Sequence, residues 1–212
     1  MIERLVRDGT AVASSDGSVH DLFPVAVSVA EGEALRGWVI GEAATHTIEV
    51  GLGYGLSALY ICEGLLANGN PTVRHVAIDP YQDTRFAGCG MQLLAEAGLA
   101  KVVEHYAEES QIALPRFSSE GRNFDLAFVD GNHRFDGVFL DLVYLGRLVG
   151  PGGILFLDDY QLPAVARAAS FCVTNLGWKV EEISAGDDLH QWAVLRTSEL
   201  PDTRPFDYFI GF

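Results

Sequence analysis

The chain has 212 residues, of which 49% are hydrophobic and 20% are charged, a balance typical of a soluble globular domain with a full core. Its 29 acidic residues outnumber its 14 basic ones, so the formal net charge is −15 at pH 7. Proteins bind nucleic acids through clustered Lys and Arg, so this composition excludes a nucleic-acid partner and favours a small-molecule ligand.

The three cysteines, Cys62, Cys89 and Cys172, are odd in number, widely spaced and without a Cys-x-x-Cys pair. This pattern indicates neither a disulfide framework nor a zinc site. No apolar run is long enough to span a bilayer, and residues 1–8 lack the apolar stretch of a signal peptide. We therefore expect a reducing compartment, by default the cytoplasm, and no membrane partner.

Residues 1–46 begin with a polar, turn-rich stretch, and a helix is expected from about residue 31 to 44. Ser28 and Glu31 have the spacing of a capping box for this helix. We expect the segment to form a lid or cap over the acceptor of a reaction, with a helix packed on the edge of a sheet as the alternative.

From residue 47 onward, short apolar runs alternate with helical patterns, which is typical of a parallel sheet covered by helices. Strands are expected near 47–51, 73–79, 101–106, 124–130, 153–158, 178–184 and 190–197, and helices near 56–68, 84–98, 134–149 and 162–176. The last two strands have a connection too short for a helical crossover, so they should pair antiparallel. The predicted fold is α/β and Rossmann-like: a mostly parallel seven-stranded sheet with helices on both faces and a C-terminal antiparallel strand pair.

We expect one domain over residues 1–212, with its core at 47–197 and a tail at 198–212. The tail ends in an aromatic-rich segment, 205–212, which would expose a large apolar surface if it were left in water. It should pack on the domain or on a second copy of the chain, which makes a homodimer one expectation.

The first of these strands runs into a loop with three alternate glycines, Gly51, Gly53 and Gly55, and then directly into a helix. Alternate glycines let the backbone turn sharply and approach a ligand, and the start of a helix offers unpaired N–H groups. The spacing, with Glu49 before it, differs from the Gly-x-Gly-x-x-Gly of dinucleotide-binding folds. The loop therefore indicates a nucleotide-like cofactor.

Polar side chains also follow the later strands, where a parallel sheet of this kind places its ligands. Asp79 ends the second strand, where a carboxylate can bind both hydroxyls of a ribose. The alternative is a turn-forming aspartate before Pro80.

Three acids, Asp130, Asp158 and Asp159, follow the fourth and fifth of these strands. Adjacent carboxylates repel one another unless protons or a cation neutralise them, and an all-oxygen set suits Mg²⁺. The alternative is that they are helix caps and solvated acids. His133 lies on the same loop as Asp130 and is a candidate proton acceptor, whereas the other histidines, His75 among them, have no comparable setting.

Residues 48–57, Ile-Glu-Val-Gly-Leu-Gly-Tyr-Gly-Leu-Ser, resemble the first motif of class I S-adenosylmethionine-dependent methyltransferases. The chain from 47 to about 197 is similar to the metal-dependent O-methyltransferases typified by catechol O-methyltransferase. The resemblance implies that the glycine loop and Ser57 hold the methionine end of the cofactor, that Asp79 binds the ribose, and that Ser110 and Gln111 lie at the adenine. The cofactor-binding residues expected are Glu49, Gly51, Gly53, Gly55, Ser57, Asp79, Ser110, Gln111 and Asp130.

Residues 128–133 and 151–160 resemble the metal and catalytic region of the same enzymes. The resemblance implies that Asp130, Asp158 and Asp159 bind Mg²⁺ or another divalent cation. His133 stands where the catechol enzymes have a lysine base, in an Asp-Gly-x-His form that resembles a bacterial branch. The implied reaction is methyl transfer to a hydroxyl group of a small metabolite, with His133 and Asp130 as catalytic residues.

Two other functions are weighed against this one. A nicotinamide-dependent oxidoreductase is disfavoured, because the later helix glycine and a Tyr-x-x-x-Lys pair are missing. A protein that binds S-adenosylmethionine without catalysis stays open.

Overall fold

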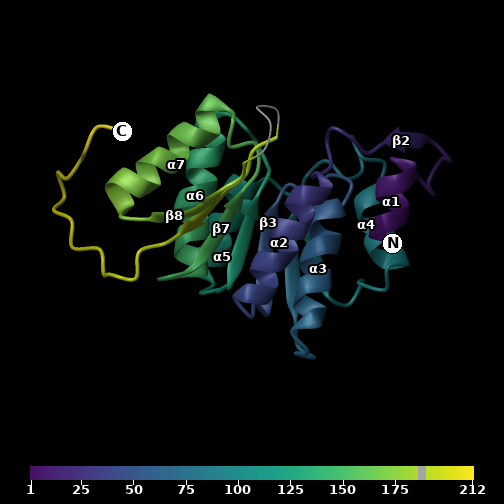
Figure 1. Ribbon diagram of the computed structural model, residues 1–212, viewed down its shortest axis with the longest axis horizontal. Helices are drawn as coiled ribbons and strands as arrows, with labels where there is room; N and C mark the ends of the chain where they lie inside the picture. The colour runs from purple at the N-terminus through teal and green to yellow at the C-terminus, as the bar shows by residue number, and fades with distance from the viewer. Residues whose placement is uncertain (186–189) are drawn as a thin grey trace. The chain divides into compact units, whose positions relative to one another are not determined.

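The computed structural model describes residues 1–185 and 190–212 (Figure 1). Its strands are β1 (Thr10–Val12), β2 (Val19–Asp21), β3 (His46–Val50), β4 (Arg74–Ile78), β5 (Val103–Tyr106), β6 (Leu126–Val129), β7 (Ile154–Leu157), β8 (Lys179–Ile183) and β9 (Ala193–Arg196). Its helices are α1 (Ile2–Asp8), α2 (Val29–Gly41), α3 (Leu56–Ala67), α4 (Cys89–Glu96), α5 (Ser110–Ser119), α6 (Phe135–Val149) and α7 (Pro163–Leu176). Residues 186–189, part of the short connection expected before the last strand, lie outside the described residues.

The central sheet has seven strands and is mostly parallel, which confirms the predicted α/β class. The chain forms two compact units, Met1–Glu109 and Ser110–Phe212. In the first unit the parallel strands run in the order β5-β4-β3. In the second unit the order is β6-β7-β9-β8, and β9 is antiparallel to both of its neighbours. The C-terminal antiparallel pair is thus confirmed.

The buried strands follow from their composition. All four residues of β6, Leu-Ala-Phe-Val, and all four of β7, Ile-Leu-Phe-Leu, are buried, as expected of central strands covered on both sides. By contrast, β8 at the sheet edge is mostly exposed and carries two glutamates. Charges of this kind discourage edge-to-edge pairing with another chain.

The N-terminal segment contains more secondary structure than its turn-rich composition suggested. Ser28 caps α2, and its hydroxyl accepts the backbone N–H of Glu31 at 3.1 Å, as the capping-box spacing predicted. Before it, α1 and the antiparallel β1–β2 hairpin form two elements that the sequence pattern did not reveal. The hairpin is fixed to α4 by Gln92, which accepts the N–H of Ser14 at 2.8 Å and donates to the carbonyl of Val12 at 3.1 Å.

Helices α2 and α3 run side by side in the first unit (Figure 1). Gly32 of α2 makes their close approach possible, because a Cβ atom at this position would overlap the ring of Tyr60. Tyr60 is only 1% exposed, so its ring has little room to move.

Gly32→Ala is therefore expected to lower the free energy of unfolding by about 1–3 kcal/mol, the usual cost of overpacking a core. Gly37→Ala is the matched control, because a Cβ atom there meets nothing within 4 Å and alanine is the better helix former by about 1 kcal/mol. Urea denaturation of both variants tests the expectation. A loss of stability that is equal in the two variants would contradict it.

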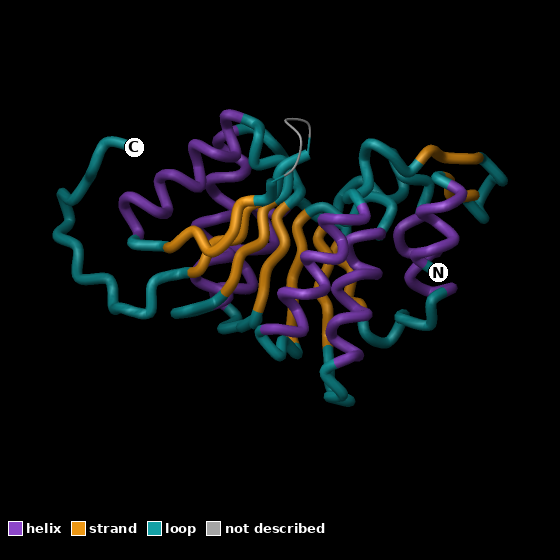
Figure 2. Tube along the Cα trace, in the orientation of Figure 1, coloured by secondary structure: helices purple, strands orange, loops and turns teal. Residues whose placement is uncertain are grey.

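In the second unit, α6 packs against β6, β7, α5 and α7. Helix α5 was not predicted, because it contains Pro115, which removes a backbone donor from the helix interior. After β9 the chain continues as a loop to the C-terminus (Figure 2).

The tail packs on its own unit at its end. Asn175 of α7 binds both backbone groups of Ile210, at 2.8 and 2.9 Å. The ring of Phe212 contacts that of Phe171 edge-on, with 5.1 Å between centroids. Phe206 and Phe209 stay exposed, so only part of the aromatic tail is covered.

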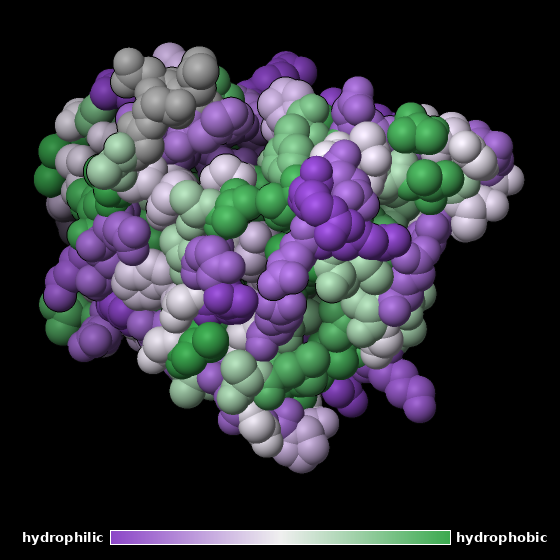
Figure 3. Space-filling model, turned by 45° about the vertical axis from the view of Figure 1, so that its right-hand side comes forward, coloured by the Kyte–Doolittle hydropathy of each residue, from purple (hydrophilic) through white to green (hydrophobic). Residues whose placement is uncertain are grey.

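On the face drawn in Figure 3, hydrophobic side chains lie in small groups among hydrophilic ones. Single exposed apolar residues of this kind are normal for a protein surface. None of the helices in the described part of the chain combines the length and the apolar character needed to cross a membrane.

Candidate active site

The glycine loop between β3 and α3 has the backbone conformation that its sequence predicts. Gly51, Gly53 and Gly55 all have positive φ angles, of 93°, 51° and 81°, which residues with a Cβ atom rarely adopt. Gly55 is also the N-cap of α3, and a Cβ atom there would lie 3.1 Å from the carbonyl oxygen of Gly90. The loop therefore depends on glycine for both its turn and its close packing.

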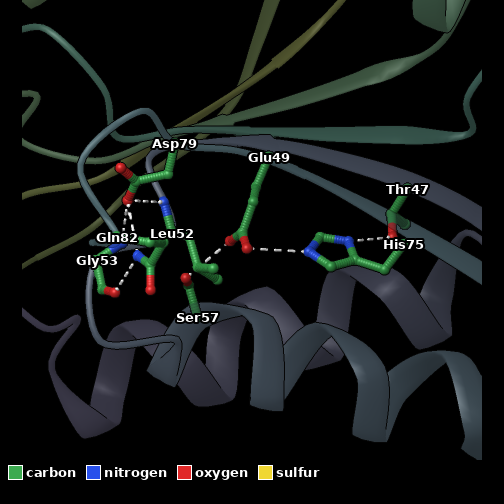
Figure 4. Close-up of polar contacts among 8 residues, drawn as sticks. All are labelled: Thr47, Glu49, Leu52, Gly53, Ser57, His75, Asp79 and Gln82. Carbon is green, nitrogen blue, oxygen red and sulfur yellow. Dashed lines mark hydrogen bonds and ion pairs between the residues drawn. The ribbon is translucent and has the colours of Figure 1, made fainter. Parts of the chain in front are cut away.

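Asp79, at the end of β4, holds this loop (Figure 4). Its Oδ2 accepts the backbone N–H groups of Leu52 at 3.2 Å and Gly53 at 2.8 Å. Its Oδ1 accepts the N–H of Tyr81 at 2.7 Å, which is the turn role considered for an aspartate before proline. A carboxylate has about four acceptor positions, so Oδ1 keeps capacity for a ligand hydroxyl.

Gln82 completes this contact, although it belongs to none of the motifs in the sequence. It is 3% exposed, and its side-chain N–H group donates to the carbonyl of Gly53 at 2.7 Å and to Asp79 at 3.1 Å. The glycine loop is thus bound through both a donor and an acceptor. The only feature of the sequence that could have pointed to Gln82 is its spacing from Asp79, Asp-Pro-x-Gln.

Behind the loop, Glu49 is fully buried on β3. Its Oε2 accepts the hydroxyl of Ser57, in the first turn of α3, at 2.8 Å. Its Oε1 lies 3.1 Å from Nε2 of His75, a second fully buried residue. His75, which the sequence pattern left without a role, is therefore next to a predicted cofactor residue.

The second unit brings the predicted acids after β6 and β7 together with His133. Nε2 of His133 lies 3.2 Å from Oδ1 of Asp130, and Nδ1 lies 3.2 Å from Oδ2 of Asp159. Asp159 has a positive φ of 52°, a conformation that aspartate tolerates better than most residues. Oδ1 of Asp158 accepts the backbone N–H of Asp159 at 2.6 Å. The imidazole ring therefore bridges two of the three carboxylates.

The electrostatics of this cluster favour a proton or a cation. Burial, followed by the charges of Asp158 and Asp159, raises the pKa of Asp130 to about 7 against the opposing hydrogen bond from His133. The hydrogen bond with Asp130, against the opposing effect of burial, raises the pKa of His133. Two carboxylates around one ring thus favour the imidazolium form when no other cation is present.

The same atoms can act as metal ligands. Asp130, His133 and Asp159 each offer one ligand atom, and these atoms lie within 4.8 Å of one another. Two carboxylates and an imidazole suit a divalent ion of the Mn²⁺, Fe²⁺ or Zn²⁺ type as well as Mg²⁺. The residues present therefore fit a divalent cation, with His133 as a ligand or as the base beside it.

Ser110 and Gln111 open helix α5. Ser110 is half-buried and hydrogen-bonds Asp141 of α6, whereas Gln111 is exposed. Asp141 is 1% exposed, and its Oδ2 has no hydrogen-bond partner among the described residues. Burial raises the pKa of Asp141 to about 6 from an ordinary value of 3.8, so this acid is costly to ionise.

An acid with a raised pKa in the folded state binds its proton more tightly there than in the unfolded chain, so its contribution to stability falls as the pH rises from 3.8 to about 6. Asp141→Asn removes the cost of ionising a buried acid. Above pH 6 we expect the free energy of unfolding to rise by on the order of 3 kcal/mol relative to the wild type. Urea denaturation at pH 4.5 and pH 8 measures the difference. A gain that is the same at both pH values would refute this expectation.

The predicted residues thus fall into two groups. The first unit brings together the glycine loop, Glu49, Ser57 and Asp79, and adds His75 and Gln82. The second unit brings together Asp130, His133, Asp158 and Asp159, with Ser110 and Gln111 on the neighbouring helix α5.

Comparison with known proteins identifies a family for the chain. A family model described as a methyltransferase domain matches residues 48–160, more than half of the chain. No curated protein matches the chain by sequence.

Several solved structures share the fold. The O-methyltransferase TomG from Streptomyces achromogenes, solved with SAM, has a TM-score of 0.71 at 22% identity over 84% of each chain. An O-methyltransferase from Bacillus cereus, solved with SAH, has a TM-score of 0.73 at 16% identity over 93% of this chain and 90% of its own. The SAH-bound methyltransferase PaMTH1 from Podospora anserina has a TM-score of 0.65 at 16% identity over 83% and 82%. The family match, on a fold that these enzymes share, shows that this chain belongs to the methyltransferase-domain family.

Proposed function

We propose that the protein is an S-adenosylmethionine-dependent O-methyltransferase that acts on a small hydroxylated molecule with the help of a divalent cation. The family match supports the reaction class. The hydrogen bonds of Asp79 to the glycine loop support a cofactor with a ribose. SAM and SAH are the ligands named for two of the structural neighbours.

The cofactor belongs to the first unit in this proposal. The carboxylate of Asp79 would accept the ribose hydroxyls, while the start of α3 and the hydroxyl of Ser57 would receive the amino-acid end. A helix N-terminus favours a carboxylate group. The buried carboxyl group of Glu49 lies directly behind this end of the site, in contact with Ser57.

The acceptor chemistry belongs to the second unit, and the His133 bridge between Asp130 and Asp159 is the observation that carries it. Methyl transfer to oxygen needs a hydroxyl that loses its proton as it attacks the methyl group. A bound divalent cation would lower the pKa of that hydroxyl. Asp130 would orient His133 and stabilise its protonated form after it accepts the proton.

The cofactor is tested by calorimetry with S-adenosylhomocysteine and NAD⁺. We expect binding of the first and none of the second. Binding of NAD⁺ alone would overturn the proposal in favour of an oxidoreductase.

The metal and the acceptor class are tested by methyl transfer from S-adenosylmethionine to a panel of catechols, sugars and other hydroxylated metabolites. Transfer should occur with Mg²⁺ or Mn²⁺ and should be lost with EDTA. Transfer that is unchanged by EDTA would remove the cation from the proposal and leave His133 as a metal-independent base. Cofactor binding without transfer to any acceptor would indicate a protein that has lost catalysis.

A further inference from the structure

A row of four buried polar side chains crosses the core of the first unit (Figure 4). Thr47 and Glu49 come from β3, His75 from β4 and Ser57 from α3. The Oγ1 of Thr47 lies 2.9 Å from Nδ1 of His75, and Nε2 of His75 lies 3.1 Å from Glu49. The hydroxyl of Ser57 donates to the other oxygen of Glu49 at 2.8 Å. The row thus leads from a strand interior to the first turn of the helix that follows the glycine loop.

The strand register produces this row. Thr47 and Glu49 are two residues apart on β3, so their side chains lie on the same face of the sheet. His75 is the direct partner of Thr47 in the parallel pairing of β3 and β4. Its ring therefore lies on that face as well and reaches the next side chain along β3, which is Glu49.

Each group in the row has its partner inside the row. Glu49 and His75 are both 0% exposed, and neither Oε1 nor Nε2 has an aligned hydrogen bond to any described residue. Oε1 of Glu49 and Nε2 of His75 lie 3.1 Å apart, and this contact is an ion pair only when the imidazole is protonated. Nδ1 is engaged by the Thr47 hydroxyl, which fixes the orientation of the ring.

Stability alone does not explain such a row. Burying a carboxylate costs several kcal/mol, and replacing a buried ion pair with apolar side chains of similar volume is often neutral or stabilising. A row of polar side chains in direct contact does, however, specify the position of each member. The row ends at Ser57, where the glycine loop meets α3. At this point the position of the side chains decides how a ligand can bind.

We propose that His75 is a positioning residue of the cofactor site. It holds the carboxylate of Glu49, and Glu49 in turn holds the hydroxyl of Ser57 and the first turn of α3, against which the amino-acid end of the cofactor binds. The inference rests on the proposed S-adenosylmethionine site. It concerns one end of that ligand, because Asp79, which serves the ribose, has no contact with the row among its described hydrogen bonds.

Two ligands allow the two ends of the cofactor site to be tested separately. S-adenosylhomocysteine carries the amino-acid end, and 5′-methylthioadenosine lacks it while keeping the adenosine and the sulfur atom. We expect His75→Leu to weaken binding of S-adenosylhomocysteine by about tenfold or more and to change binding of 5′-methylthioadenosine by less than about twofold. Calorimetry with both ligands measures this difference.

A conservative variant and a control sharpen the test. His75→Gln keeps an N–H donor for Glu49 and should recover most of the affinity for S-adenosylhomocysteine. His46→Leu, at the exposed start of the neighbouring strand β3, should leave both affinities unchanged. If His75→Leu does not fold, Thr47→Val removes the partner of Nδ1 with little change in volume, and it should show the same selectivity between ligands with a smaller loss.

The outcomes are distinct. An equal loss for both ligands, or no loss in His75→Leu or Thr47→Val, would overturn the inference while leaving the proposed function intact. A wild-type protein that binds neither ligand would overturn the proposed function, and the inference would fall with it.

Discussion

Asp79→Ala is expected to weaken binding of S-adenosylhomocysteine by at least about 100-fold, which corresponds to about 2.7 kcal/mol. The carboxylate is 3% exposed, and it accepts the N–H groups of Leu52, Gly53 and Tyr81 together with the side chain of Gln82. Its removal leaves the loop N–H groups without their acceptor and removes the acceptor for the ribose. We also expect the free energy of unfolding to fall by about 3 kcal/mol, since bonds to a charged acceptor are among the stronger ones.

Calorimetry measures the first effect and urea denaturation the second. Asp83→Ala is the matched control, because Asp83 is an exposed aspartate in the same connection and both quantities should be unchanged in this variant. Affinity within about threefold of the wild type in Asp79→Ala would show that the glycine loop does not depend on this carboxylate.

Asp130→Asn is expected to slow methyl transfer by about 10²- to 10⁴-fold, the range typical of losing general acid–base assistance. Asparagine has the same shape but no charge, so it can neither stabilise a protonated His133 nor bind a divalent cation as strongly. The contact between Asp130 and His133 is 3.2 Å, and the Asp130 side chain is 20% exposed. Transfer rates at saturating S-adenosylmethionine measure the effect.

Asp136→Asn provides the control, because Asp136 is 75% exposed at the start of the next helix and its loss should not slow transfer. A second measurement tests whether Asp130 and His133 act together. If they do, the double variant Asp130→Asn/His133→Gln should be only slightly slower than the slower of the two single variants. The effects of substituting residues that act as a unit are not additive. Fully additive losses would show independent roles.

The sequence predicted a large share of the fold. The apolar runs of β6 and β7 identified the central strands of the sheet, because a strand covered on both sides has few polar residues. The C-terminal antiparallel pair followed from the short connection between its strands. The predictions missed α5, where Pro115 interrupts the helical pattern, and the β1–β2 hairpin, whose strands have only three residues each.

The candidate site was predictable where its residues follow one another along the chain. Gly51, Gly53 and Gly55 can adopt their positive φ angles because glycine has no Cβ atom, so three alternate glycines before a helix indicated a sharply turning loop. Acids at the ends of parallel strands meet at one edge of the sheet by topology. Asp79, Asp130, Asp158 and Asp159 could therefore be chosen as candidates from their positions alone.

The sequence by itself thus determined where the strands lie along the chain, the glycine loop and the acids at the strand ends, because these depend on local backbone chemistry and on the periodicity of buried side chains. Only the tertiary structure decided the partners: His75 beside Glu49, Gln82 under the loop, Asp141 behind Ser110, and the His133 ring between two carboxylates. Each of these depends on which residues far apart or on different elements reach one another. That is set by strand register and helix packing, for which a single sequence carries no local signal.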